Sequence, residues 1–394
     1  MYFTEEHNLF RKSLQDFLQK EVVPHIEKWE KTGNIDRFIW KKFGDMGFFG
    51  INYPEAYGGM DLDLFYTVIL LEELQKINSG GFAAAIWAHV YLAMTHLQAE
   101  GDEAIKQKYL IPSISGDKIG CLCISEPFGG SDVAGMRTTA IKNGDHYLIN
   151  GSKTFITNGV LSDYLIVTAK TTPELGNKGI SIFVLDRDMA GVSATKLNKL
   201  GWNASDTGEI AFANVKVPVE NLLGEENKGW TYAKYLLQKE RSFVARVAQS
   251  RHLVQRLKSS VSEQKVGAVP LLGSAEFRRR MARLEIDLQA LEYTELRYLS
   301  KELQGEPVGP EPSILKIRGS EIQQGLKQLL VESLGMYGVP YENDSMKLSD
   351  SYMEVGPEHR HGILAEHLYG RGATIFGGSN EIQRNIISRM LLGT

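Results

Sequence analysis

The feature that most constrains the fold of this chain is the spacing of its apolar residues, which changes twice along the sequence. From Thr4 to about Gly116, apolar residues recur at intervals of three and four, which is the period of an α-helix. From about Lys118 to Val219 the chain consists of short β-rich runs, and after Gly224 the helical spacing returns. This order predicts an α+β protein with an N-terminal all-α domain, a central β-domain and a C-terminal helical domain, at residues 1–117, 118–224 and 225–394.

Individual elements follow from the same patterns. The predicted helices of the first and third regions cover Asp36–Met46, Leu64–Ile77, Gly81–Gln98, Glu103–Leu110, Ala275–Gln304, Pro312–Leu334 and Asn380–Leu392. Asn-Gly pairs at 143–144, 150–151 and 158–159 predict tight turns between strands. No helical pattern separates those strands, so we expect an antiparallel β-domain rather than a doubly wound sheet. The segment Lys258–Ser274 interrupts the helical spacing and is predicted to be a loop.

Composition and charge argue against several classes of protein. The 394 residues carry a net charge of −4, which provides neither a basic field for nucleic acid nor a polybasic membrane patch. The N-terminus, MYFTEEHNLFRKSLQDF, lacks the basic and then apolar order of a secretory signal, so we expect a cytoplasmic location in a prokaryote or an organelle matrix. The most apolar segment, Gly81–Gln98, contains His89 and His96 and is short for a membrane span, so a buried helix is the better interpretation.

The cysteines and the absent motifs narrow the possible compartments and classes of active site. Cys121 and Cys123 lie on one predicted strand, where we expect their side chains to point to opposite faces and to remain unbridged. Such low cysteine usage is typical of a reducing compartment. The sequence contains no Rossmann fingerprint after a strand, no P-loop and no Gly-x-Ser-x-Gly elbow. The nearest approach to metal-ligand spacing is His359 and His361 in EHRHG, a polar loop in which solvated histidines are the simpler interpretation, so no metal is expected.

Two segments of the β-domain have the composition of a ligand site. CISEPFGGSDVAG, residues 123–135, combines adjacent glycines with small hydroxyl residues, and such a loop suits a phosphate or the edge of a heterocycle. GSKTFITNG, residues 151–159, is predicted to place Phe155 and Thr157 on one face of a strand, where the ring would pack against a flat cofactor. From residue types alone, an ordinary Gly-rich turn and a core phenylalanine are the simpler interpretations.

Taken together, these segments resemble the acyl-CoA dehydrogenase family. The first matches the family's first signature, which is a small residue, an aliphatic, Ser or Thr, Glu, two variable positions and then Gly-Gly-Ser-Asp. The second is similar to its flavin-facing strand, and TIFGGSNEIQR, residues 374–384, is similar to its C-terminal helix start. YPEAYGG near Tyr53 and the segment Gly201–Gly224 also resemble family segments, so the resemblance covers essentially the whole chain. It implies a barrel- or sandwich-like β-domain and a C-terminal four-helix bundle.

The resemblance also implies FAD as the cofactor and an acyl-CoA thioester as the substrate. In that reaction one hydrogen leaves Cα as a proton, and one leaves Cβ as hydride for flavin N5. The positions implied to bind FAD are Leu122, Ile124, Ser125, Gly130, Ser131, Phe155, Ile156, Thr157, Ser379 and Glu381. Phe155 would lie along the isoalloxazine, and Ser131 would also lie near the CoA moiety.

The catalytic base is less obvious, because many family members have a glutamate where this sequence has Gly377. The segment Gly229–Val247 is predicted to form one helix whose apolar face includes Glu240. A carboxylate there needs a partner or a raised pKa, and from the pattern alone a glutamate paired with an arginine is favoured. The long-chain and isovaleryl branches of the family carry their base at this position, directly before an arginine. The resemblance therefore implies Glu240 as the base, Arg241 on the CoA side of the substrate, and the Gly377 N–H as a donor to the thioester carbonyl.

The resemblance implies electron-transfer flavoprotein as the acceptor and a homotetramer, or a heterotetramer with a related subunit. Two alternatives remain open at this stage. One is an acyl-CoA oxidase-type enzyme that passes electrons to oxygen, and the other is a non-catalytic subunit with the family fold. The segment ESLGMYG, Glu332–Gly338, departs from the family's cross-subunit FAD segment at Glu332 and Met336.

Overall fold

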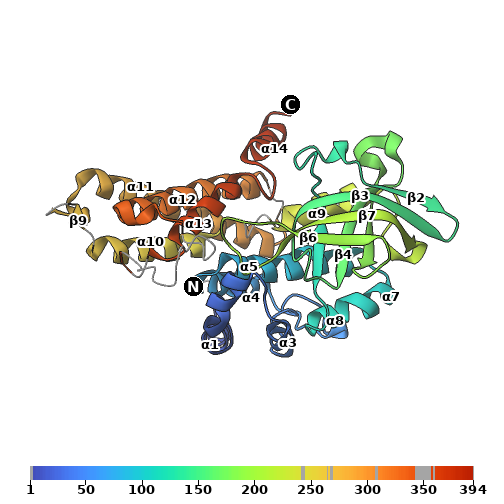
Figure 1. Ribbon diagram of the computed structural model, residues 1–394, viewed down its shortest axis with the longest axis horizontal. Coiled ribbons are helices and arrows are strands. Elements are labelled where there is room, and N and C mark those ends of the chain that lie inside the picture. Colours follow the sequence, from blue (N-terminus) through green and yellow to red (C-terminus); the bar gives the residue numbers. More distant parts are fainter. Residues whose placement is uncertain are drawn as a thin grey trace, which may run out of the picture. The chain divides into compact units, whose positions relative to one another are not determined.

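The computed structural model describes residues 3–240, 245–263, 265–266, 269–306, 309–341, 356–357 and 360–393. The chain divides into two compact units, Met1–Asn198 with Asn203–Glu240, and Lys199–Trp202 with Arg241–Thr394. The first unit contains the N-terminal helices and the sheet, and the second contains the C-terminal helices (Figure 1). The predicted order of helices, strands and helices is therefore confirmed, while the bounds of the three domains stay predictions.

The N-terminal part of the first unit is helical. Its α-helices are α1 (Glu5–Phe17), α2 (Ile26–Thr32), α3 (Arg37–Asp45), α4 (Leu64–Lys76), α5 (Gly80–Trp87), α6 (Met94–Glu100), α7 (Glu103–Ile105) and α8 (Ile111–Ile114). The predicted buried helix over residues 81–98 is confirmed as α5 and α6, joined by a π-helical turn at Ala88–Ala93. Both of its histidines are almost fully buried. No helix in the described part of the chain is long and apolar enough to cross a membrane.

The central part of the first unit is one eight-stranded sheet. Its strands are β1 (Gly120–Cys123), β2 (Thr139–Asn143), β3 (His146–Thr157), β4 (Tyr164–Lys170), β5 (Ile180–Asp186), β6 (Val192–Lys196), β7 (Thr207–Pro218) and β8 (Leu222–Leu223). The strand order is β6-β7-β3-β2-β4-β5-β8, and β1 pairs with β4. The pairing is antiparallel except where β1 and β2 meet β4, so the predicted antiparallel β-domain is confirmed in its main part.

Two local expectations in the sheet are wrong. Asn150-Gly151 does not make a turn, because it lies inside β3 at a shift of register against β7. Cys121 and Cys123 do not point to opposite faces, since their sulfur atoms lie 3.7 Å apart in the core and both thiols are free. Alternate residues of a strand share a face, which is why the two sulfurs meet.

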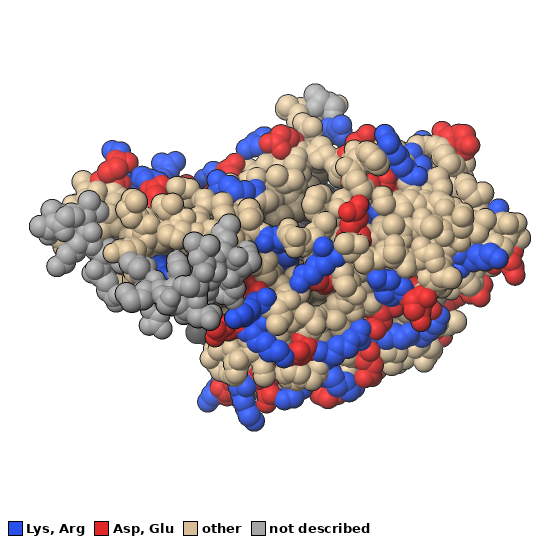
Figure 2. Space-filling model, viewed as in Figure 1, with Lys and Arg blue, Asp and Glu red and all other residues tan. Residues whose placement is uncertain are grey.

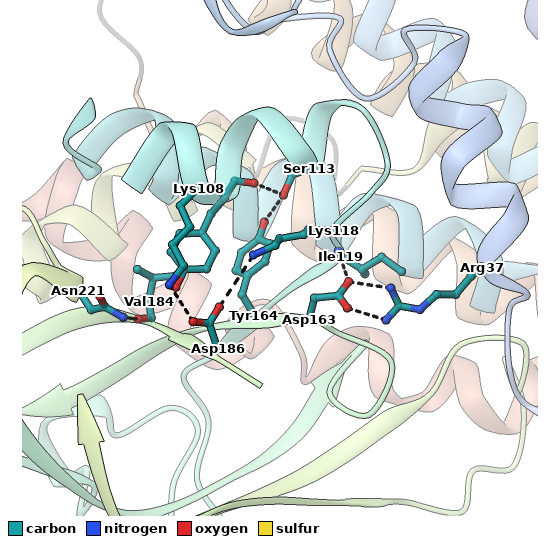
Figure 3. Close-up of polar contacts among 11 residues, drawn as sticks. Arg37, Lys108, Ser113, Lys118, Ile119, Asp163, Tyr164, Val184, Asp186 and Asn221 are labelled. Carbon is teal, nitrogen blue, oxygen red and sulfur yellow. Dashed lines mark hydrogen bonds and ion pairs between the residues drawn. The ribbon is translucent and has the colours of Figure 1, made fainter. Parts of the chain in front are cut away.

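Polar contacts join the N-terminal helices to the sheet within the first unit (Figure 3). The guanidinium of Arg37 on α3 donates to both carboxylate oxygens of Asp163, at 2.9 and 2.8 Å. Asp163 also accepts the backbone N–H of Ile119 at 2.8 Å. The hydroxyl of Ser113, at the end of α8, lies 3.0 Å from the hydroxyl of Tyr164 on β4. These contacts fix the start of β1, from which the candidate site begins.

The second unit is built around one buried helix. Its helices are α10 (Val247–Glu263), α11 (Ala275–Leu303), α12 (Glu311–Ser333), α13 (Ile363–Gly370) and α14 (Asn380–Leu392). Helix α12 packs against the other four (Figure 1), and the three long helices predicted in this region are confirmed. The predicted loop at 258–274 is wrong in its first part, because α10 continues to Glu263 before a short hairpin, β9 (Lys265–Val266) and β10 (Val269–Pro270).

The single helix predicted over Gly229–Val247 is also wrong at its end. Helix α9 (Gly229–Glu240) belongs to the first unit, whereas Ala245 and Arg246 are not helical and α10 begins at Val247. Arg246 has a φ of +50°, which a helix cannot contain.

On the face drawn in Figure 2, lysine and arginine are interspersed with acidic residues, so that face has no large field of one sign.

Candidate active site

The loop after β1 has a fixed shape that brings the two predicted ligand segments together. Glu126 and Gly129 exchange two backbone hydrogen bonds of 3.1 Å each, which closes a tight turn. The backbone N–H of Thr154 in β3 donates to the carbonyl of Ser125 at 2.9 Å. The glycine-rich loop and the strand that carries Phe155 are therefore directly connected.

A buried ion pair lies beneath this connection. The ammonium of Lys153, whose side chain is 0% exposed, lies 2.9 Å from a carboxylate oxygen of Glu126. It also donates to the carbonyl of Ile124 at 3.1 Å and to the hydroxyl of Thr168 at 3.4 Å. A lysine has three N–H donors, so each has an acceptor. The ammonium thus joins the end of β1, the loop and β4.

The carboxylate of Glu126 is equally well supplied with partners. Besides Lys153, it accepts the backbone N–H groups of Arg137 at 2.7 Å and Thr138 at 3.0 Å. Burial acts to raise the pKa of Glu126, but Lys153 and these donors outweigh burial and leave the pKa lowered. Burial lowers the pKa of Lys153, and Glu126 opposes that change. This pair orders both ends of the glycine-rich loop.

Phe155 is held in an unusual conformation above that pair. Its φ is +61°, its ring is 72% exposed, and it lies at a shift of register between β3 and β7. A large side chain in the left-handed region is a strained arrangement, and such strain is concentrated at functional sites. Ile156 is buried and Thr157 is half-buried, so Phe155 is presented as a flat apolar surface beside a hydroxyl.

The hydroxyl groups of this region are available to a ligand. Those of Ser125, Ser131 and Thr157 make no hydrogen bond with any residue that the structure describes. Ser131 is exposed like its neighbour Gly130, whereas Leu122, Ile124, Ser125 and Thr157 are half-buried. An exposed ring beside unsatisfied hydroxyls fits the face and edge of an isoalloxazine, so the residues present are compatible with FAD.

In the second unit, the segment before α14 forms a glycine turn. Gly377 and Gly378 have φ values of +67° and +81°, and the side-chain amide of Gln383 donates to both of their carbonyls at 3.3 Å. Gln383 is itself held by the hydroxyl of Ser313 at 2.8 Å. The Gly377 N–H has no acceptor among the described residues. This turn therefore presents a backbone donor that is fixed in place.

The other predicted residues near this turn contribute to the start of the helix. The Ser379 hydroxyl caps α14 by accepting the N–H of Ile382 at 3.4 Å. Glu381 is exposed, and its pKa is lowered first by its own backbone N–H and then by Ser379. Glu332, one of the two departures in the family's cross-subunit segment, pairs with Arg280 through contacts of 2.6 and 3.1 Å. Met336, the other departure, is 82% exposed.

The structure describes the backbone of the expected catalytic base, Glu240. Glu240 is the last residue of α9, and nothing beyond its backbone is described. Arg241 lies outside the described residues. Ala233 on the same helix is fully buried, and position 240 follows it by two helical turns, which places both positions on one face.

The fold and the site define a flavoprotein dehydrogenase class, and comparisons with known proteins identify the family. Residues 4–117, 121–215 and 227–392 match the N-terminal, middle and C-terminal domains of acyl-CoA dehydrogenase. The chain belongs to the acyl-CoA dehydrogenase family, whose members are oxidoreductases.

Individual relatives are similar to this chain over almost its whole length. The chain is 33% identical to the mitochondrial long-chain specific acyl-CoA dehydrogenase of Sus scrofa, over 99% of this chain and 87% of that protein. It superposes on an acyl-CoA dehydrogenase from Geobacillus kaustophilus with a TM-score of 0.89 and 32% identity, over 99% of each chain. It also superposes on a chain of the electron transferring flavoprotein of Acidaminococcus fermentans, with a TM-score of 0.85 and 29% identity over 100% of each.

The sequence reasoning singled out neither Glu126 nor Lys153, although both lie inside the quoted segments. A signal was present, because Lys153 is a charged residue on a strand in which Ile149 and Ile156 are buried. Charged residues are rarely buried unless they are paired, so such a lysine indicates a nearby carboxylate. The partner was not identifiable, since the pairing depends on how β1 and β3 meet.

Proposed function

We propose that this protein oxidises an acyl-CoA thioester to the trans-2-enoyl-CoA with FAD as its cofactor. Bound FAD supplies the acceptor for the hydride that leaves Cβ. The observation that carries the proposal is the combination of exposed Phe155 with three hydroxyls that bond to no described residue, in a chain of this family. Phe155 lies along the isoalloxazine, Ser125 and Thr157 bind its edge, and Leu122, Ile124 and Ile156 provide the surrounding backbone.

Other residues hold the rest of the cofactor and the substrate. Gly130 and Ser131, which are exposed at the tip of the loop, face the flavin phosphates, and Ser131 also contacts the CoA moiety. Ser379 and Glu381 contribute to the ADP half of FAD at the start of α14, where the helix dipole favours an anion. Arg241 holds the CoA side of the substrate.

Glu240 removes the α-proton in this proposal. Its position shares a helical face with buried Ala233, and a carboxylate at this position is the group proposed as general base. The Gly377 N–H donates to the thioester carbonyl, which stabilises the negative charge that develops there as the proton leaves. That N–H is free for this role because no described residue accepts it.

The test is the reduction of bound flavin by an acyl-CoA under anaerobic conditions. Glu240→Gln should retain FAD but lose the bleaching of the flavin band by about 10²–10⁴-fold in rate, which is the usual contribution of a general base. Glu220→Gln, which alters an exposed glutamate on the same unit, is the matched control. Bleaching of Glu240→Gln at the normal rate would reject Glu240 as the base.

A second experiment relocates the base. Gly377→Glu in a Glu240→Gly background should restore part of the turnover, because the family's commonest position for the base is then filled. Recovery should be incomplete, because a residue with a side chain at a φ of +67° is strained by about 1–2 kcal/mol. No recovery in a variant that folds and binds FAD would mean that position 377 does not face the substrate.

The proposal extends to the electron acceptor and to the assembly of the protein. Electrons pass to electron-transfer flavoprotein, so acyl-CoA should reduce that protein in a coupled assay without rapid oxygen uptake. Rapid oxygen uptake would instead identify an oxidase, and a colourless purified protein would identify a non-catalytic subunit. A homotetramer, or a heterotetramer with a related subunit, is consistent with Ile286 and Tyr293 on α11, which are 63% and 64% exposed. A cytoplasmic or matrix location completes the proposal.

A further inference from the structure

The second unit contains a guanidinium enclosed by aromatic rings. Arg246, in the turn before α10, lies with its guanidinium carbon 5.2 Å from the ring centre of Trp202 and 5.4 Å from that of Phe376. Trp202 is 8% exposed, and its segment Lys199–Trp202 belongs to the same unit as Arg246 and Phe376. As a residue, Arg246 is half-buried.

This guanidinium has no counterion among the residues that the structure describes. No described carboxylate forms an ion pair with it, and the described groups that contact it are the rings of Trp202 and Phe376. Burial lowers the pKa of Arg246 to about 10, and only Tyr369 acts in the opposite direction. Contacts with aromatic rings offset part of the cost of desolvating a cation, but a ring provides no acceptor for its hydrogen-bond donors, and no described residue accepts from them either.

The surroundings increase the local excess of positive charge. The ammonium of Lys327, whose side chain is 3% exposed, lies 5.6 Å from the ring centre of Trp202. Lys327 shares one carboxylate, Glu366, with Arg256, at 3.7 and 2.9 Å. Burial lowers the pKa of Lys327, and so do Arg246 and Arg256. In the described part of this cluster, Lys327 and Arg256 share one carboxylate and Arg246 pairs with none, an arrangement that an additional anion would stabilise.

We propose that Arg246, between Trp202 and Phe376, binds a carboxylate on the acyl chain of the substrate. A guanidinium offers paired donors that match a carboxylate, and here it lies close to two aromatic rings. The preferred substrate class is then a thioester of a dicarboxylic acid. This inference rests on the proposed function.

The place of Phe376 in the chain selects the acyl group as the source of the anion. Phe376 directly precedes Gly377, whose N–H is the proposed donor to the thioester carbonyl. The phosphates of CoA lie at the far end of the pantetheine arm from that carbonyl, whereas a second carboxylate on the acyl chain lies near it. The same guanidinium would bind either group, so an experiment has to distinguish the two sources.

The experiment uses the flavin-loaded protein and pairs of CoA thioesters of equal chain length, with and without a terminal carboxylate. The wild-type protein should prefer the carboxylated member by at least about tenfold in kcat/KM for flavin reduction, which is the effect of one well-placed charged contact. Arg246→Met should bring that ratio close to one, and Arg246→Lys should retain part of it. Arg318→Met, on exposed α12 surface, should leave the ratio unchanged.

Each result decides the matter. A tenfold preference that persists in pantetheine thioesters, which lack the nucleotide phosphates, supports the acyl carboxylate. If Arg246→Met instead weakens both members of each pair alike, and that loss disappears with pantetheine thioesters, the anion belongs to CoA and the proposal is overturned. If simple acyl-CoAs reduce the flavin and carboxylated ones are not preferred, this inference fails and the proposed function stands. If no thioester reduces the flavin, the proposed function fails, and this inference fails with it.

Discussion

The two units of the molecule each enclose a cation, and the two cations have very different partners. Lys153, in the sheet, has an acceptor for each of its three donors, and one of these is the carboxylate of Glu126. Arg246, in the helical unit, has two aromatic rings and no described carboxylate. A buried cation whose donors all have protein acceptors stabilises the fold. A buried cation whose donors lack acceptors in the described structure can donate to a ligand. The comparison therefore assigns a structural role to Lys153 and a binding role to Arg246.

The largest effect should come from breaking the pair in the sheet. Glu126→Gln leaves the ammonium of Lys153 buried without a counterion, and removal of one partner of a buried ion pair costs about 3–5 kcal/mol. Urea unfolding should show this loss, and the flavin content should fall because the loop after β1 is no longer ordered. The double variant Glu126→Leu/Lys153→Met, which buries no charge, should recover most of the stability. A single variant as stable as the wild type would show that the pair is dispensable.

The next largest effect for a single group should come from acid, which protonates two buried histidines that are neutral. Burial lowers the pKa of both His89 and His96 from 6.5 to about 4. Because the pKa is lower in the folded state than in the unfolded state, the associated stability is complete above pH 6.5 and is lost as the pH falls toward 4. The loss amounts to roughly 3 kcal/mol for each histidine. Below pH 4.5 the protonation of Glu126, whose pKa is also lowered, should add to it.

Unfolding free energies measured by urea between pH 8 and pH 4 test this expectation. The neutral ring of His89 accepts the N–H of Gly120 at 3.1 Å and donates to the carbonyl of Ser113 at 3.3 Å, so protonation would break the first contact. His96→Gln should flatten the pH profile by about half, since one of the two titrating groups is removed. A profile that does not change between pH 6.5 and pH 4 would contradict the assignment.

The sequence was sufficient for features that repeat along the chain, and insufficient for features that depend on contacts between distant segments. The periods of apolar residues predicted α4, α11, α12 and α14 within a residue or two. The turn predicted from Asn150-Gly151 is wrong, because this pair lies inside β3. Its pairing with β7 shifts register there instead of ending the strand. The helix predicted through Val247 failed because a local period cannot reveal the change at Arg246 from helical to left-handed backbone.

The residues of the candidate site also fall into those that the sequence predicted and those that it did not. Residue types in two short segments pointed to Phe155, Ser125 and Thr157. In the structure Phe155 is exposed, and the two hydroxyls have no partner among the described residues. Lys153 was missed since its partner lies twenty-seven positions earlier in the chain. Arg246 was missed because its significance depends on Trp202 and Phe376, which come from two other segments of the second unit.

The glycine turn of the helical unit should respond less strongly. Gly377→Ala places a side chain at a φ of +67°, which costs about 1–2 kcal/mol, but the new methyl group meets no atom within 4 Å. Gly378→Ala should cost more, because its methyl group would lie 2.6 Å from the amide nitrogen of Gln383, which is held by Ser313. Urea unfolding of the two variants checks this order. Equal losses would mean that Gln383 moves freely, and that the Gly377 N–H is not fixed.

The smallest effect on stability is expected at Arg246, where the loss of function should be specific. Arg246→Met removes a cation that has no described counterion and keeps an apolar side chain between the two rings, so the free energy of unfolding should stay within about 1 kcal/mol of the wild-type value. Residues kept for binding are often neutral or unfavourable for folding, because their partner is the ligand. Urea unfolding without ligand, compared directly with Glu126→Gln, gives the measurement. A loss of 3 kcal/mol or more would make the two cations equivalent and would place Arg246 in the fold rather than in the binding site.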